Sequence, residues 1–171
     1  SVGCPAPKRA AALQAWGFTC GCPVCSREED YFRGFRCPSD GCTEIVWART
    51  SVAWSPLQVC ACAAGHIFSA ANASSVEQAE ARVRETLGWL EAHADKPEAS
   101  EHALAEYQVA VQGGLAPGRH WGLAALQEAA AVACWKHGQP ASAAQCNDFV
   151  AFREWCLALG CPHKVPQGLP Q

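Results

Sequence analysis

The sequence contains no methionine and no apolar run that approaches the roughly 18 to 20 residues needed to cross a bilayer. Only 17% of its 171 residues are charged, and 13 Lys and Arg stand against 16 Asp and Glu, which gives a formal net charge of −3. A protein that binds nucleic acid mainly through phosphates needs a basic excess, which is lacking here. We therefore predict neither a membrane segment nor a nucleic-acid partner.

The N-terminus also lacks the basic flank and apolar core of a targeting signal. Because the sequence starts at Ser1 without Met, we expect a processed end or a cut through a longer protein. The 171 residues suit one compact unit or two small ones, and they exclude a large multidomain enzyme.

Cysteine is abundant, and its distribution divides the chain. Eight of the twelve cysteines lie in the first 62 residues: Cys4, Cys20, Cys22, Cys25, Cys37, Cys42, Cys60 and Cys62. The other four are Cys134, Cys146, Cys156 and Cys161. The first three of these stand at helix-periodic positions among apolar residues, so we expect buried, inert thiols there. Metal or disulfide chemistry is expected of the first group.

Residues 1–70 are punctuated by Gly, Pro and Cys, which is typical of loops held by local cross-links. A short helix over residues 8–16 is the exception, because Leu13 and Trp16 share one face. A segment of this size buries too little apolar surface to fold unaided, so disulfides or a metal are expected to stabilise it.

From Ser75 onward the sequence is rich in Ala, Leu and Glu, with apolar residues at spacings of three and four. This periodicity predicts four helices, over residues 75–93, 98 or 100 to 112, 119–137 and 141–159. Ser75 with Gln78 three residues later has the form of a capping box, and Gly or Pro separates the helices.

Short turns make such helices antiparallel neighbours, and Ala and Gly let them approach closely, as in helical-repeat arrays. The predicted fold class is thus mostly α: an irregular zinc-stapled N-terminal segment, residues 1–70, followed by an antiparallel TPR-like helical bundle, residues 75–171. An ordinary four-helix bundle is the alternative, since no clean repeat period is visible.

Three thiols within six residues form the strongest motif, Cys20-Gly-Cys22-Pro-Val-Cys25. They are too close for adjacent disulfides without strain, but they suit a metal. Zn²⁺ takes four ligands in a tetrahedron, and Cys4 is the only thiol upstream that can supply the fourth.

A second motif follows with the spacing of a zinc ribbon. Cys37 and Cys42 are separated from Cys60 and Cys62 by seventeen residues, and His66 lies shortly after them. We predict a second site of these four cysteines, in which His66 is an alternative to Cys62.

Eight cysteines at four per ion give two zinc ions. Both predicted sites have four protein ligands and leave no position for water, so we expect them to hold the fold rather than to catalyse a reaction. A disulfide-rich secreted fold is the competing interpretation. Zinc together with free helical thiols instead favours a reducing compartment, the cytoplasm or the nucleus.

The run from residue 9 to residue 25 resembles the post-SET segment of the SET and MYND domain lysine methyltransferases. That segment has an Arg, a Leu, an aromatic residue and a Phe, followed by Cys-x-Cys-x2-Cys. The matching residues here are Arg9, Leu13, Trp16, Phe18, Cys20, Cys22 and Cys25. The later order, a second cysteine stretch and then TPR-like helices, is also similar to the family.

The resemblance implies that the parent protein transfers a methyl group from S-adenosylmethionine to a lysine. It implies that Trp16 and Phe18 line the cofactor or substrate side of the zinc loop. Aromatic faces suit adenine or an alkylammonium group, although both residues also suit a small metal-stapled core. A protein substrate or partner is expected, and the mildly acidic helical half favours Lys-rich ones.

The sequence departs from the family in two respects. The SET core, which binds the cofactor and normally supplies the fourth zinc ligand, would lie before Ser1, so this chain alone is not expected to be catalytic. If Ser1-Val2-Gly3 corresponds to the end of that core, Val2 stands where the catalytic Tyr would be, and the parent protein is a pseudoenzyme. The alternative function is a non-catalytic zinc-binding adaptor that binds a partner protein through its helices.

Overall fold

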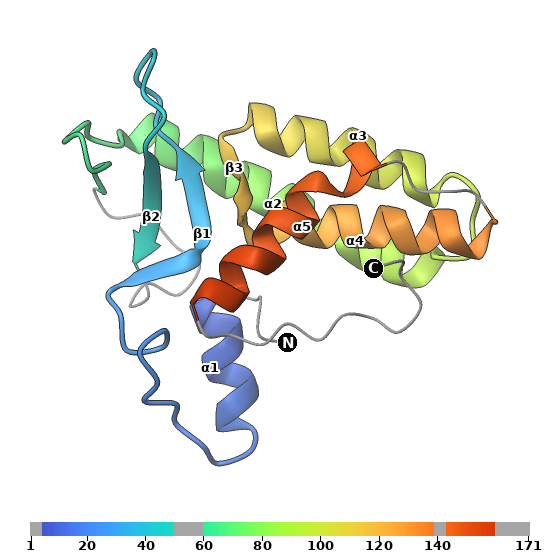
Figure 1. Ribbon diagram of the computed structural model, residues 1–171, viewed down its shortest axis with the longest axis horizontal. Coiled ribbons are helices and arrows are strands. Elements are labelled where there is room, and N and C mark those ends of the chain that lie inside the picture. Colours follow the sequence, from blue (N-terminus) through green and yellow to red (C-terminus); the bar gives the residue numbers. More distant parts are fainter. Residues whose placement is uncertain (1–4, 50–59, 139–142, 160–171) are drawn as a thin grey trace.

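The structure is a computed structural model that describes residues 5–49, 60–138 and 143–159 (Figure 1). This part of the chain is mostly α-helical. Its helices are α1 (Ala6–Gln14), α2 (Ala70–His93), α3 (Ala99–Gln112), α4 (Trp121–Lys136) and α5 (Ala143–Ala158), and its strands are β1 (Glu29–Arg36), β2 (Ile45–Arg49) and β3 (Leu115–His120). None of the described helices is long and apolar enough to span a bilayer.

The three strands form one antiparallel sheet in the order β2-β1-β3. The central strand β1 pairs Gly34 with Trp47 of β2, and it pairs Arg33 with His120 of β3. Because β3 lies between α3 and α4 in the sequence, the cysteine-rich segment and the helical segment on either side of residue 70 share this sheet. Figure 1 shows the sheet at one end of the helices.

The helices largely follow the predicted periodicity, with two differences at their starts. The apolar face expected of the helix predicted over residues 75–93 is confirmed, because Val76, Ala79, Val83 and Leu90 are buried on α2. However, α2 begins at Ala70, where Ser69 and Asn72 form the capping box, and not at residue 75. The helix predicted over residues 119–137 begins at Trp121 as α4, and the residues just before it belong to β3.

Small residues let the helices pack closely, as expected from their abundance. Ala99, Ala103 and Ala110 on α3 are fully buried. Gly113 ends α3 against α2, where an added Cβ would lie only 2.8 Å from the Cβ of Ala79. Consecutive helices contact one another from α2 to α5.

The last helix is fixed to the sheet by aromatic side chains. Trp155 of α5 stacks on Trp47 with ring centroids 5.9 Å apart, and its Nε1 donates a hydrogen bond of 3.0 Å to the carbonyl oxygen of Tyr31. The guanidinium of Arg119 lies 4.5 Å from the Trp155 ring centroid, a cation–π distance. Residues from β1, β2, β3 and α5 therefore form one aromatic cluster.

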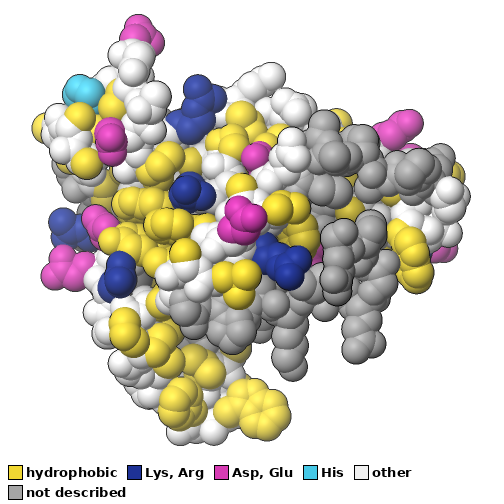
Figure 2. All heavy atoms as spheres, viewed as in Figure 1, with side chains coloured by type: hydrophobic (Ala, Val, Ile, Leu, Met, Phe, Trp, Pro, Cys, Tyr) yellow, Lys and Arg dark blue, Asp and Glu magenta, His cyan; other side chains and the backbone are white. Residues whose placement is uncertain are grey.

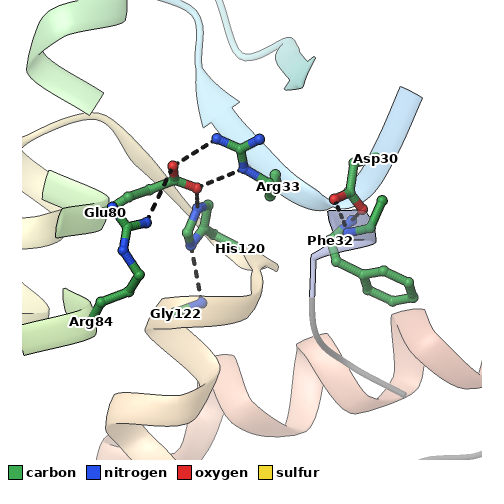
Figure 3. A network of polar contacts seen from close by, with 8 residues as sticks. Asp30, Phe32, Arg33, Glu80, Arg84, His120 and Gly122 are labelled. Carbon is green, nitrogen blue, oxygen red and sulfur yellow. Dashed lines mark hydrogen bonds and ion pairs between the residues drawn. The ribbon is translucent and has the colours of Figure 1, made fainter. Parts of the chain in front are cut away.

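A buried ionic network links the sheet to the helices (Figure 3). Arg33 of β1 donates two hydrogen bonds, of 2.8 and 2.7 Å, to the carboxylate of Glu80 on α2. His120 Nε2 lies 3.0 Å from Glu80 Oε1, while His120 Nδ1 accepts a 3.1 Å bond from the Gly122 backbone N–H at the start of α4. Because Nδ1 accepts, Nε2 carries the proton, and the Nε2–H group donates a hydrogen bond to Glu80 Oε1.

The network fixes the charge states of its members. Burial on its own raises the pKa of Glu80, but the hydrogen bonds from His120 and Arg33 outweigh it and hold that pKa at about 2. Burial lowers the pKa of His120, whose side chain is fully enclosed. At neutral pH the network therefore consists of an arginine cation, a carboxylate and a neutral imidazole.

The free energy of unfolding is expected to decrease as the pH falls below about 6.5, the ordinary pKa of histidine. Below that pH the unfolded chain takes up a proton at His120 that the folded chain resists, so the unfolded state binds more protons and gains stability. Urea unfolding between pH 8 and pH 5.5 measures this effect. The His120→Gln variant lacks the pH-dependent contribution of His120, so the difference in unfolding free energy between wild type and variant should shrink towards acid pH. A difference that stays constant across this pH range would contradict the role given to His120.

Candidate metal centres

Four potential ligand atoms come together between the β1–β2 loop and the turn that precedes α2. The Sγ atoms of Cys37, Cys42 and Cys62 and a ring nitrogen of His66 all lie within 4.8 Å of one another. Cys37 follows directly after β1, and Cys62 and His66 lie shortly before α2. We call this group the second cluster, because Cys20, Cys22 and Cys25 form another one earlier in the sequence.

The spacing of these atoms fits a tetrahedral ion. Cys37 Sγ and Cys62 Sγ each lie 3.5 Å from His66 Nδ1, and Cys42 Sγ lies 4.0 Å from Cys62 Sγ. Around a tetrahedral Zn²⁺ with Zn–S of about 2.3 Å and Zn–N of about 2.0 Å, sulfur and nitrogen are about 3.5 Å apart and two sulfurs about 3.8 Å apart. Three thiolates and one imidazole thus fit zinc in number, type and distance.

Two tight turns place these ligands. In the β1–β2 loop, the Cys42 N–H donates to the Ser39 carbonyl oxygen at 3.1 Å, and Gly41 has a φ of +73°. In the second turn, the Gly65 N–H donates to the Cys62 carbonyl oxygen at 2.8 Å, with a φ of +81° at Gly65. Glycine suits both positions, because side-chain-bearing residues rarely adopt positive φ.

The second cluster sits at the edge of the core. Cys37 and Cys62 are buried, Cys42 is half-buried and His66 is exposed. Burial raises the pKa of Cys37, but hydrogen bonds led by the backbone N–H of Ser39 outweigh it and leave that pKa lowered. A lowered pKa favours the thiolate, which is the form that binds metal.

The cluster differs in one member from the set predicted by spacing. His66 belongs to it, as the predicted alternative allowed, but the residue outside it is Cys60 and not Cys62. Cys60 is 8% exposed and packs in the hydrophobic core, and its carbonyl oxygen accepts a hydrogen bond from Phe68 N–H at 2.8 Å. Burial raises the pKa of Cys60, but the pKa of Cys42 in the cluster is raised as well, so position and not pKa separates Cys60 from the ligands.

Cys20, Cys22 and Cys25 form the first cluster, and their Sγ atoms also lie within 4.8 Å of one another. The predicted fourth ligand, Cys4, lies outside the described residues. The backbone N–H of Cys25, with further donors, lowers the pKa of Cys22 to about 7, while burial raises the pKa of Cys25 to about 11. The three thiols supply three of the four ligands that a structural zinc ion takes.

Helix α1 attaches the first cluster to the rest of the molecule. Its Arg9 is buried, with Nη1 3.5 Å from Asp30 Oδ1 and the guanidinium 4.7 Å from the Phe32 ring centroid. Asp30 also accepts a hydrogen bond from the Ala6 backbone N–H, and Figure 3 shows it at the start of β1. These contacts fix the near end of α1, so the loop that follows it projects away from the sheet (Figure 1).

Trp16 and Phe18, the two aromatic residues singled out by the sequence, lie at the far end of α1 and point to solvent. Trp16 is 87% exposed and Phe18 is 53% exposed. The helix ends there in a Schellman motif, with Gly17 N–H donating to the Gln14 carbonyl and Phe18 N–H donating to the Leu13 carbonyl. Figure 2 shows hydrophobic side chains gathered on the surface at this tip of the molecule.

No disulfide joins any two of the described cysteines. Cys134 and Cys156 are buried among the helices, as their sequence positions predicted. Cys146 and Cys161 fall on residues whose side chains are not described.

No family model, curated protein or solved structure matches this chain. The two clusters give the chain a capacity to hold metal ions.

Proposed function

We propose that this chain is the zinc-binding and helical part of a SET and MYND type protein-lysine methyltransferase, in which the first cluster helps to close the cofactor and substrate site. The observation that carries the proposal is the exposure of Trp16 and Phe18 directly before that cluster. A contiguous exposed apolar patch, unlike a single exposed residue, marks a surface that binds a ligand or partner. A rigid metal loop beside them would hold them in place.

Zinc is the metal that suits both clusters. Thiolate and imidazole are its usual ligands, and three sulfurs with one nitrogen at tetrahedral distances form a closed structural site. Zinc bound at the second cluster, and at the first with a fourth ligand, stabilises the fold. A reducing compartment, the cytoplasm or the nucleus, would keep these thiols available.

Trp16 and Phe18 are suited to the cofactor side of such a site. S-adenosylmethionine presents an adenine ring and a positively charged sulfonium, and aromatic faces attract both. Within this proposal the two side chains cover a cofactor held by a SET core in the longer protein, and this chain supplies no catalytic group of its own.

The helical part is proposed to be TPR-like and to recognise a protein. Support comes from the packing of consecutive helices from α2 to α5 through small residues such as Ala99 and Ala103. In helical-repeat proteins this arrangement presents a concave surface to partners. Between α3 and α4, however, the chain passes through β3, which an ordinary repeat lacks.

The test is a thermal shift of the longer protein with S-adenosylmethionine. At a hundredfold excess over Kd, a ligand that binds only the folded state stabilises it by about 2.7 kcal/mol, which corresponds to a rise in Tm of about 5 °C. We expect this rise in the wild type and a reduced rise at the same cofactor concentration in Trp16→Ala and Phe18→Ala. Trp135→Ala, a change of a 61% exposed aromatic residue on α4, is the matched control and should keep the full shift.

Two outcomes would contradict the proposal. The first is the absence of any shift at saturating cofactor, which would favour the non-catalytic adaptor. The second is an equal shift in all three variants, which would leave the exposed aromatic side chains without a part in cofactor binding. This chain by itself is expected to show no shift.

A further inference from the structure

A groove of about 630 Å³ runs along the helical part of the molecule, outside both metal clusters. Its walls come mainly from α2 and α4, with α1 and α5 contributing Lys8, Phe149 and Phe152. Small side chains dominate the α4 wall, including Ala125 and Ala129, which are only half-buried. Because these side chains are short, the backbone of another segment can approach α4 closely.

Gly88 lies on the α2 wall of this groove, in the middle of a 24-residue helix. Glycine inside a helix is less stable than alanine by about 1 kcal/mol. The glycines at residues 113 and 122 are explained by contacts within the chain, because a Cβ there would lie 2.8 Å from a neighbouring side chain. At Gly88 an added Cβ would meet no atom of the described residues within 4 Å. Among the described residues, none fills the space that the missing side chain leaves.

The charged side chains along the groove are balanced in sign. Lys8 and Arg84 are balanced by Glu91 and Glu128, so the groove has no net charge to attract a strongly acidic or basic ligand. On α2, Arg84 and Glu91 are seven residues and thus about 10.5 Å apart, one on each side of Leu87 and Gly88. Glu91 is exposed, and the Arg84 side chain is 39% exposed with its Nη1 4.0 Å from Glu80 Oε2 on the same helix.

We propose that the groove binds a second copy of this chain. Two α2 helices cross antiparallel at Leu87 and Gly88, about a two-fold axis midway between these residues. In this arrangement Arg84 of each copy faces Glu91 of the other, because the two positions are equally far from the axis. An isologous contact needs such a self-complementary surface, and Gly88 lets the two backbones approach closely.

This inference is independent of the metal proposal and of the methyltransferase proposal, since none of the groove residues belongs to either metal cluster or to the Trp16–Phe18 surface. It is tested by sedimentation equilibrium of the 171-residue chain with its metal bound. The wild type is expected to reach a mass about twice 18.2 kDa at micromolar concentration. A mass of 18.2 kDa up to several hundred micromolar would overturn the proposal.

Charge reversal tests the geometry of the pairing. Arg84→Glu and Glu91→Arg each place like charges opposite one another twice per dimer, and we expect each to raise the dimer Kd at least about tenfold. Because Arg84 also lies 4.0 Å from Glu80, the melting temperature of each variant that carries Arg84→Glu is measured alongside its Kd. The double variant Arg84→Glu/Glu91→Arg restores both pairs with their signs exchanged, so its Kd should return to within about threefold of the wild type. Glu85→Arg makes the same charge change outside the groove and should leave the Kd unchanged.

Gly88→Lys separates the interface from folding of the monomer. Lysine is a better helix former than glycine and its side chain has open space in the monomer, so thermal stability should hold or rise while dimerisation is lost. Single reversals or Gly88→Lys that leave the dimer intact would overturn the proposal. So would a double reversal that dimerises no better than the single variants.

Discussion

Replacing Cys62 with alanine is expected to remove the metal from the second cluster and to destabilise the entire chain, not only its first 70 residues. An ion held by the second cluster would join the β1–β2 loop to the turn before α2, and β1 is the central strand that pairs with β3. Structural zinc contributes an apparent 10 to 16 kcal/mol in small domains, about as much as the whole stability of a typical domain. Elemental analysis should show about one zinc ion fewer per chain, and the circular dichroism of the helices should melt earlier or be lost.

Cys60→Ala is the matched control, because Cys60 is a buried cysteine two residues away that lies outside the cluster. This variant should keep the wild-type metal content and lose only about 1 to 2 kcal/mol through reduced packing. A chelator added to the wild type should reproduce the effect of Cys62→Ala. If Cys60→Ala releases the metal and Cys62→Ala retains it, the ligand set shown by the structure is wrong.

The helices were predictable from the sequence because their signals are local. The stripe from Val76 to Leu90 repeats every three or four residues, and the four long helices lie close to the predicted ranges. Their starts were less predictable where two caps compete. Ser69 with Asn72 and Ser75 with Gln78 both resemble capping boxes, and the helix takes the earlier one because it adds more than a turn of hydrogen bonds.

The strands were not predicted, because pairing partners far apart in sequence decide them. β1 does not alternate between apolar and polar residues, since a register shift between Asp30 and Gly34 turns Arg33 into the core beside Glu80. β3 contains Pro117 and Gly118, which indicate a turn when read alone. As an edge strand, β3 tolerates a proline that could not donate to the ladder of a central strand.

The metal ligands could be predicted as groups but not one by one. Spacing places Cys37, Cys42, Cys62 and His66 in one region, and the structure brings them together. Spacing does not show that the hairpin closed by the Ala61–Ile67 bridge leaves Cys60 in the core. The turn Cys62-x3-His66, with a glycine before the histidine, is the local signal that distinguishes the two cysteines.

Replacing Glu80 with alanine is expected to lower the free energy of unfolding by about 3 to 5 kcal/mol, the cost of leaving a buried partner charge uncompensated. Arg33 and Glu80 side chains are each only 2% exposed, so water cannot replace the lost carboxylate at the guanidinium. His120 also loses the acceptor for its Nε2 proton. Urea denaturation at pH 7.5 measures the change.

Glu106→Ala is the comparison that separates burial from pairing. Arg82 of α2 donates two hydrogen bonds of 2.9 Å to Glu106 of α3, a bidentate geometry like that of Arg33 and Glu80. The Arg82 side chain, however, is 57% exposed. Water can solvate that guanidinium once its partner is gone, so the loss should stay near about 1 kcal/mol. Equal losses in the two variants would mean that the Arg33–Glu80–His120 network contributes no more than an exposed ion pair. A larger loss in Glu80→Ala measures the cost of leaving the Arg33 guanidinium buried without its carboxylate, a cost that the exposed Arg82 avoids.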